Sequence, residues 1–202
     1  MSVVGIVPAA GAGERLGADL PKAFAVLAGR PMVEWSLEVL REVCDRVVVA
    51  VPADRVVGPD FVAGGATRSE SVRNAIAAAP EASVFVVHDA ARPLVTVELA
   101  RRCIDALEGY DGVIAAVPVT DTVKEVERLD VVRTPERDRL WAAQTPQVFR
   151  AEVLRSATGE ATDDASLVEA AGGRVRVVEG MRENFKVTSP LDARVAEMLL
   201  AD

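Results

Sequence analysis

The sequence predicts an α/β domain built on a mainly parallel sheet with helices on both faces. Short runs of β-branched residues alternate along the chain with helical segments, and this alternation favours parallel strands joined by crossover helices. The strand runs are apolar throughout, as is typical of strands buried on both faces. At 202 residues the chain has the length of one domain with an added part. We therefore expect a single domain over residues 1–202, with an arm at about 119–140.

Most elements are expected in strict alternation. Strands are expected over residues 3–7, 46–51, 83–87, 113–117 and 175–178, and helices over 31–40, 67–79, 97–108, 162–172 and 189–200. Pro31 suits the first position of a helix, and Thr67 with Glu70 has the spacing of a capping box. Thr162 is expected to start the penultimate helix, which a glycine pair ends. Ser189 is expected to cap the last helix, with a proline at its first position.

The pattern changes between residues 119 and 134. Polar and β-branched residues are mixed there, with a turn expected near Leu129 and Asp130, and this predicts a hairpin that projects from the body. The segment from Trp141 to Phe149 then returns to the core.

Composition excludes several classes of protein. The 31 acidic residues outnumber the 23 basic ones, and a net charge of −8 argues against a nucleic-acid partner. No apolar run approaches the ~18 residues of a membrane span, and the N-terminus lacks a signal-peptide pattern. The two cysteines and the single histidine lack the spacing of a zinc site. Reduced thiols are typical of the cytoplasm, so we expect a cytoplasmic protein. We also expect that it has no membrane attachment and no second catalytic domain.

The loop after the first strand, Pro8 to Gly17, consists mostly of small residues, which let backbone N–H groups approach an anion. Its third glycine falls one position late for a dinucleotide fingerprint, and the Gly-Lys-Ser/Thr of a P-loop is missing. By spacing alone the loop is equally well a plain tight turn. Arg15 and Lys22 in the same segment favour a phosphate role, because lysine supplies a compact point charge. In parallel sheets such loops meet at the carboxyl ends of the strands, where ligands bind.

Further motifs follow in order along the chain. Together they are Pro-Ala-Ala-Gly-x-Gly-x-Arg at 8–15 with Pro-Lys at 21–22, Gly-Gly-x-x-Arg-x-x-Ser-Val at 64–72, His-Asp-Ala-Ala-Arg-Pro at 88–93, Asp-Thr-x-Lys at 121–124, Thr-Pro-Gln at 145–147 and Lys-Val-Thr at 186–188. This set resembles the 2-C-methyl-D-erythritol 4-phosphate cytidylyltransferases of the non-mevalonate isoprenoid pathway. The resemblance implies a three-layer Rossmann-like nucleotidyltransferase fold. It also implies transfer of a cytidylyl group from CTP to a polyol phosphate, with release of pyrophosphate.

Two positions depart from the pattern of that family. Ala23 follows Lys22 where the family commonly has glutamine, and Ala66 follows the glycine pair where an acidic residue is frequent. Contacts to the base at the second position would therefore come from backbone groups.

The implied reaction needs no general base. A phosphate monoester is already ionised near neutral pH, because its second pKa is about 6. The obstacle is repulsion between two anions and the charge that develops on the α-phosphate and the leaving group. Cations, backbone N–H groups and Mg²⁺ can reduce this repulsion and stabilise the developing charge, so Mg²⁺ is the expected cofactor. Because no general base is needed, His88 is expected to be structural.

The resemblance assigns residues to each part of the site. The implied catalytic residues are Arg15, Lys22, Arg137 and Lys186. The implied nucleotide-binding residues are Pro8, Ala9, Ala10, Gly11, Ala12, Gly13, Gly64, Arg68, Ser71, Asp89 and Ala90. The implied residues for the polyol phosphate are Asp89, Arg92, Thr122, Arg137, Thr145 and Lys186. Asp89 would also face Mg²⁺, which the phosphates would mostly hold.

In the family the arm reaches into the neighbouring subunit. The resemblance therefore implies a homodimer formed through residues 119–140, in which Thr122 and Arg137 serve the partner's site. For Arg68 and Arg139, a solvated surface position is an equal alternative. Two other functions stay open: a ribitol 5-phosphate cytidylyltransferase, which has the same chemistry, and a non-catalytic nucleotide-binding module.

Overall fold

A computed structural model describes residues 1–11 and 21–201. Within them lies a seven-stranded sheet with the strand order β11-β7-β10-β6-β1-β4-β5. Its strands are β1 (Val3–Pro8), β4 (Arg46–Val51), β5 (Phe61–Ala63), β6 (Val84–Val87), β7 (Gly112–Pro118), β10 (Trp141–Arg150) and β11 (Val175–Glu179). Strand β10 runs antiparallel to both of its neighbours, and the other pairs are parallel. The prediction of a mainly parallel sheet is confirmed.

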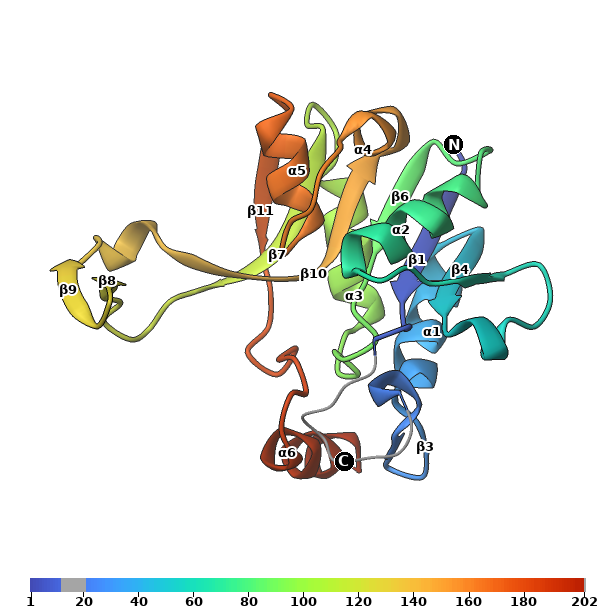
Figure 1. Cartoon of the computed structure of the whole chain (residues 1–202), viewed down its shortest axis with the longest axis horizontal. Helices are drawn as coiled ribbons and strands as arrows, with labels where there is room; N and C mark the ends of the chain where they lie inside the picture. Colours follow the sequence, from blue (N-terminus) through green and yellow to red (C-terminus); the bar gives the residue numbers. More distant parts are fainter. Residues whose placement is uncertain (12–20, 202) are drawn as a thin grey trace.

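Helices cover both faces of this sheet, as expected (Figure 1). One face packs against α1 (Met32–Val43) and α3 (Val97–Asp105), and the other against α2 (Arg68–Ala77), α4 (Ala151–Ser156) and α5 (Asp164–Ala170). Successive strand residues point to opposite faces, so Val7 enters the first apolar cluster and Ile6 the second. Both side chains are fully buried. The result is the three-layer architecture that the sequence predicts.

The capping residues place most helix starts correctly. Ser189 caps α6 (Pro190–Leu200) in a capping box with Asp192, and proline occupies the first turn. The Thr67 side chain accepts from the Glu70 N–H at the start of α2. The Glu70 carboxylate, however, accepts from the Ala66 N–H at 2.7 Å, one residue before the position that completes a capping box.

Two predicted helix starts are wrong by one or two residues. Pro31 is the cap of α1 and not its first residue, because it still pairs in a short strand, β3 (Arg30–Pro31), with β2 (Val26–Leu27). The cap of α5 is Asp163 and not Thr162, since the Asp163 carboxylate accepts from the Ser166 N–H at 3.2 Å. Strands β2, β3 and β5 and the short helix α4 were not predicted from the sequence.

The expected hairpin is present and projects from the body (Figure 1). It consists of β8 (Glu125–Glu127) and β9 (Asp130–Arg133), which pair antiparallel. Arg128 and Leu129 have positive φ angles of 47° and 76° and form the turn. Side chains along it are exposed, including Val126, Leu129 and Val131. We call residues 119–140 the arm.

Candidate active site

The loops at the carboxyl ends of β1 and β6 surround a cavity of about 590 Å³, which we call the main cavity. Its lining residues are Pro8, Ala9, Ala10, Gly11, Lys22, Ala23, Gly65, Ala66, Thr67, Arg68, Ser71, Asp89, Ala90, Ala91 and Lys186. Ten of the residues assigned from the sequence are among them: Pro8, Ala9, Ala10, Gly11, Lys22, Arg68, Ser71, Asp89, Ala90 and Lys186. Ala12, Gly13 and Arg15 lie outside the described residues. The structure thus brings together segments from both ends of the chain.

Backbone hydrogen bonds fix the loops that follow β1 and β5 to the strand β4 between them. The Ala9 N–H donates to the Ala50 carbonyl at 2.7 Å, and the Gly64 N–H donates to that of Val51 at 2.8 Å. A Cβ at Gly64 would lie 2.2 Å from the Ala10 Cβ, so a larger residue there would push the loops apart. Gly64 therefore allows its loop to lie close to Ala10, and its neighbour Gly65 lines the main cavity.

Ser71 shapes the loop that the sequence analysis assigned to the base. Its hydroxyl donates to the Thr67 carbonyl at 2.9 Å and accepts from the Gly65 N–H at 3.1 Å. The hydroxyl thus stabilises the turn that exposes backbone groups to the cavity, and its role as a ligand of the base stays a prediction.

Asp89 is the electrostatic centre of the site. Its carboxylate accepts from Lys186 Nζ at 2.8 Å and from Arg68 Nε at 3.1 Å, and Arg92 Nε lies 3.9 Å away. Burial alone would raise the pKa of Asp89, but these three cations more than offset it and hold the pKa well below its usual range. Asp89 therefore stays ionised, and it gathers positive charge at the point where the segments meet.

Arg68 is not a solvated surface residue, because its guanidinium bridges two carboxylates. It donates to Asp89 and, through Nη1, to Asp164 on α5 at 2.8 Å. The Asp164 side chain is 2% exposed, and burial raises its pKa despite the bridge. Arg68 thereby links α2, the end of β6 and α5 beside the cavity.

His88 is structural in this geometry. It is fully buried, and burial lowers its pKa to about 4, so the ring is neutral. Its Nε2 contacts the Arg92 carbonyl at 3.1 Å, which only an N–H can do, so Nδ1 carries no proton. Nδ1 then accepts from the Thr145 hydroxyl at 2.9 Å, and that hydroxyl accepts from the Asp89 N–H at 3.0 Å. Both ring nitrogens are occupied in positioning neighbours.

This burial predicts a pH-dependent stability. The unfolded chain binds a proton on His88 below pH 6.5, but the native state binds it only below about 4. Protonation therefore favours unfolding as the pH falls through that window, by up to about 3 kcal/mol for the full shift. Urea denaturation between pH 7.5 and 4 should show a steeper loss of unfolding free energy for the wild type than for His88→Gln. Parallel curves for the two proteins would contradict this account of the histidine.

A second cavity of about 280 Å³ adjoins the main one and shares Arg68, Asp89 and Lys186 with it. We call it the side cavity. It is also lined by Arg92 and Thr145, both assigned to the polyol phosphate from the sequence. It is also lined by four further polar residues that were not predicted as site residues: Gln144, Gln147, Thr162 and Asp163. Two signals were available in the sequence. Gln147 belongs to the Thr-Pro-Gln motif, and the polar run 162–164 precedes a helix, which indicates a helix cap as readily as a ligand.

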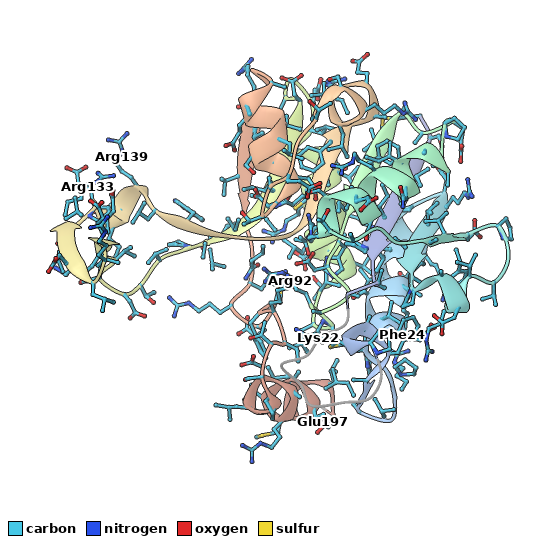
Figure 2. All side chains as sticks on the ribbon, in the orientation of Figure 1. Lys22, Phe24, Arg92, Arg133, Arg139 and Glu197 are labelled. Carbon is cyan, nitrogen blue, oxygen red and sulfur yellow. The ribbon has the colours of Figure 1, made fainter. Side chains whose placement is uncertain are left out.

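Thr122 and Arg137 line neither cavity. They belong to the arm, where Arg137 Nη1 donates to the Thr120 carbonyl at 2.9 Å. Figure 2 shows Lys22 and Arg92 on the body, and Arg133 and Arg139 well apart from them near the end of the arm. With the arm extended as it is here, Thr122 and Arg137 could act only at cavities of another chain.

The site fits a divalent cation only with help from a ligand. No group of three or more His, Cys, Asp or Glu side chains that could hold a metal occurs in the described part of the chain. Asp89 offers one carboxylate, already bound by two cations, and Mg²⁺ is commonly held by one or two carboxylates together with substrate phosphates.

Within residues 1–11 and 21–201, no helix is long and apolar enough to cross a membrane.

Solved structures similar to the chain give its class. The crystal structure of 2-C-methyl-D-erythritol 4-phosphate cytidylyltransferase from Thermus thermophilus superposes with a TM-score of 0.86 and 36% identity, covering all of both chains. That of the Francisella tularensis enzyme gives a TM-score of 0.84 and 31% identity over 98% of this chain and 99% of that one. Fold and site thus define an α/β protein of the nucleotidyltransferase class.

Sequence comparison narrows the class. The family model of 2-C-methyl-D-erythritol 4-phosphate cytidylyltransferase (IspD) matches residues 3–202. The proteins of that name from Nocardia farcinica and Frankia casuarinae are 48% and 49% identical to this chain over 98% of its length, covering 94% and 81% of theirs. The chain belongs to the 2-C-methyl-D-erythritol 4-phosphate cytidylyltransferase family.

Proposed function

We propose that the protein transfers the cytidylyl group of CTP to 2-C-methyl-D-erythritol 4-phosphate, giving 4-diphosphocytidyl-2-C-methyl-D-erythritol and pyrophosphate. One observation carries the proposal beyond family membership. Lys22, Arg68 and Lys186, from three distant segments, line one cavity together with the small-residue backbone of the loop after β1. Such a cavity suits a reaction between two anions.

In this proposal, the protein catalyses the reaction by stabilising the negative charge that develops on the phosphates. The phosphate monoester attacks the α-phosphorus of CTP in line, one P–O bond forms, and the bond to pyrophosphate breaks. Lys22 and the backbone N–H groups of the loop stabilise the charge that develops on the transferring and leaving phosphates. No side chain removes a proton, which agrees with a neutral His88 whose ring nitrogens are both hydrogen-bonded.

The side cavity is the proposed position of the polyol phosphate. Lys186 and Arg92 supply positive charge there, and Asp89 and Thr145 supply oxygen atoms at the boundary with the main cavity. The ionised Asp89 can accept hydrogen bonds from polyol hydroxyls. Because Arg68, Asp89 and Lys186 line both cavities, the nucleophile and the triphosphate would meet beside them.

Mg²⁺ is the proposed cofactor. It would be held by the triphosphate oxygens with Asp89 nearby, and when bound it supplies positive charge to the phosphates. Activity measured with Mg²⁺ and after chelation tests this part separately.

The protein is proposed to act as a cytoplasmic homodimer. The exposed apolar side chains of the arm support the dimer: Val126, Leu129, Val131 and Val132 are each at least 54% exposed. Cys44 and Cys103 are unpaired, which agrees with a reducing compartment. Burial raises the pKa of each thiol to about 12, so both stay protonated and unreactive at neutral pH.

The direct test is pyrophosphate release from CTP, methylerythritol phosphate and Mg²⁺. We expect turnover that depends on all three components, and a product with the mass of 4-diphosphocytidyl-2-C-methyl-D-erythritol in mass spectrometry. Ribitol 5-phosphate assayed side by side separates the remaining alternative of the same chemistry. A folded protein that binds CTP without turning over either polyol phosphate would overturn the proposed activity and favour a non-catalytic nucleotide-binding module.

A further inference from the structure

Lys186 is carried by a segment that belongs to no helix or strand. Residues 181–188, which we call the strap, connect β11 to α6. The Lys186 side chain is 43% exposed, whereas Asn184 and Val187 on either side of it are 0% and 1% exposed. Because no ladder or helix fixes this backbone, the position of the ammonium group depends on how these two buried neighbours are anchored.

The anchor on the C-terminal side combines a backbone hydrogen bond with apolar packing of Val187. The Val187 N–H donates to the Ala91 carbonyl at 2.8 Å, and its side chain packs in a small cluster with Met32 and Ala196. The Asp192 carboxylate then accepts from the Thr188 N–H at 2.7 Å at the start of α6. This side of the strap is part of the helix cap.

The anchor on the other side is the side-chain amide of Asn184. Its Nδ2 donates to the Thr145 carbonyl at 2.8 Å and to Gln144 Oε1 at 3.2 Å, both on β10. The Gln144 Nε2 returns a hydrogen bond to the Met181 carbonyl of the strap at 2.7 Å. Asn184 Oδ1 is buried and has no donor among the described residues, so the polar interactions of this side chain run through Nδ2.

The backbone of Asn184 holds a second cation. Its carbonyl accepts from Arg92 Nη1 at 2.8 Å, and Arg92 Nη2 reaches the Ala143 carbonyl at 3.4 Å. Asn184 therefore connects β10 to both Arg92 and Lys186, which are two of the three cations, with Arg68, that line the side cavity.

We propose that Asn184 is a positioning residue for the polyol phosphate. It fixes the strap to β10 and so sets the places of Lys186 and Arg92, without touching the substrate itself. The inference rests on the proposed function, because it assigns those two cations to the phosphate of the second substrate. Small displacements of charged groups weaken binding and catalysis steeply, so the loss of this anchor should be visible in kinetics.

The test compares Asn184→Asp and Asn184→Ala with the wild type. Aspartate keeps the volume of the side chain but places a carboxylate oxygen where the amide donates to the Thr145 carbonyl and Gln144 Oε1. It removes both hydrogen bonds without leaving a cavity, so the test does not rest on the alanine variant alone. We expect KM for methylerythritol phosphate to rise roughly 10- to 100-fold. The Kd for CTP should change far less, because Lys186 is one of many residues that line the main cavity. Calorimetric binding of methylerythritol phosphate, in the presence of a non-transferable CTP analogue, should weaken in the same proportion.

Two further measurements separate positioning from general destabilisation. Leu154→Ala, a core truncation in α4 that lines neither cavity, should lower the melting temperature but leave both ligand affinities unchanged. In a Lys186→Ala, Arg92→Ala background, adding Asn184→Asp should change kcat/KM less than about twofold, because the cations it positions are gone.

Unchanged KM and Kd for methylerythritol phosphate in a folded Asn184→Asp variant would overturn the inference, as would an equal weakening of CTP. Full additivity in the triple variant would overturn it too. Failure of the proposed function looks different, since the wild type itself would then show neither turnover nor binding of methylerythritol phosphate.

Discussion

Replacing Lys22 by alanine is expected to lower kcat/KM roughly 10²- to 10³-fold, by analogy with the loss of one preorganised group that stabilises developing charge. Lys22 lines the main cavity, and the backbone that carries it is well held. The Phe24 N–H donates to the Pro21 carbonyl at 2.8 Å, and Ala23 is buried in the core. The charge is therefore placed by a hydrogen-bonded turn, so removing it removes stabilisation from the transition state.

Steady-state pyrophosphate release measures this effect, with Lys22→Arg and Arg101→Ala as companions. Arginine keeps the charge but not the compact shape, so it should recover part of the rate. Arg101 lies exposed on α3 away from both cavities, and its variant should behave as the wild type. A Lys22→Ala rate within a few-fold of the wild type would show that the lysine has no role in stabilising the triphosphate.

Arg137→Ala and Lys186→Ala are each expected to be nearly inactive alone, and to recover activity when mixed. The arm extends from the body (Figure 1). Arg137 lines neither cavity of its own chain. If the arm completes the partner's site, a heterodimer of the two variants contains one intact site and one that lacks both residues. Random exchange makes half of the dimers mixed, so the mixture should reach about a quarter of wild-type activity.

Affinity tags of two kinds allow the heterodimer to be isolated before the assay. Arg137→Ala alone should damage the use of methylerythritol phosphate more than the binding of CTP. The double variant Arg137→Ala, Lys186→Ala mixed with the wild type gives the matched control, since its heterodimers hold no intact site. A confirmed heterodimer with no more activity than either parent would show that the sites are not shared across the dimer.

The sequence was sufficient for the order and type of most elements, for local reasons. Continuous apolar runs identify strands buried on both faces, and side-chain caps such as Ser189 identify helix starts within one turn. The errors are also local. Pro31 satisfies the rules for a first helical residue, but its pairing in β3 with residues 26–27 decides the boundary.

The candidate site was predictable as a set of motifs, not as a network. The resemblance of these motifs to the family implied site roles for Asp89, Arg92 and Lys186. It gave no reason to connect Arg68 with Asp164, or Asn184 with Thr145, because those partners lie 96 and 39 residues apart. Gln144 and Asn184 carried no signal at all, since buried amides have no pattern of their own in a single sequence.

Local patterns along the chain were enough to predict the α/β class, the arm and a site built from lysine, arginine and small-residue loops. The packed fold adds the ion pair at 2.8 Å between Lys186 and Asp89, which lie 97 residues apart, and the neutral His88 that orders the residues around it. The difference comes from the range of the interactions. Periodicity and capping act within a few residues, whereas desolvation and ion pairing depend on which distant segments the packed sheet brings together.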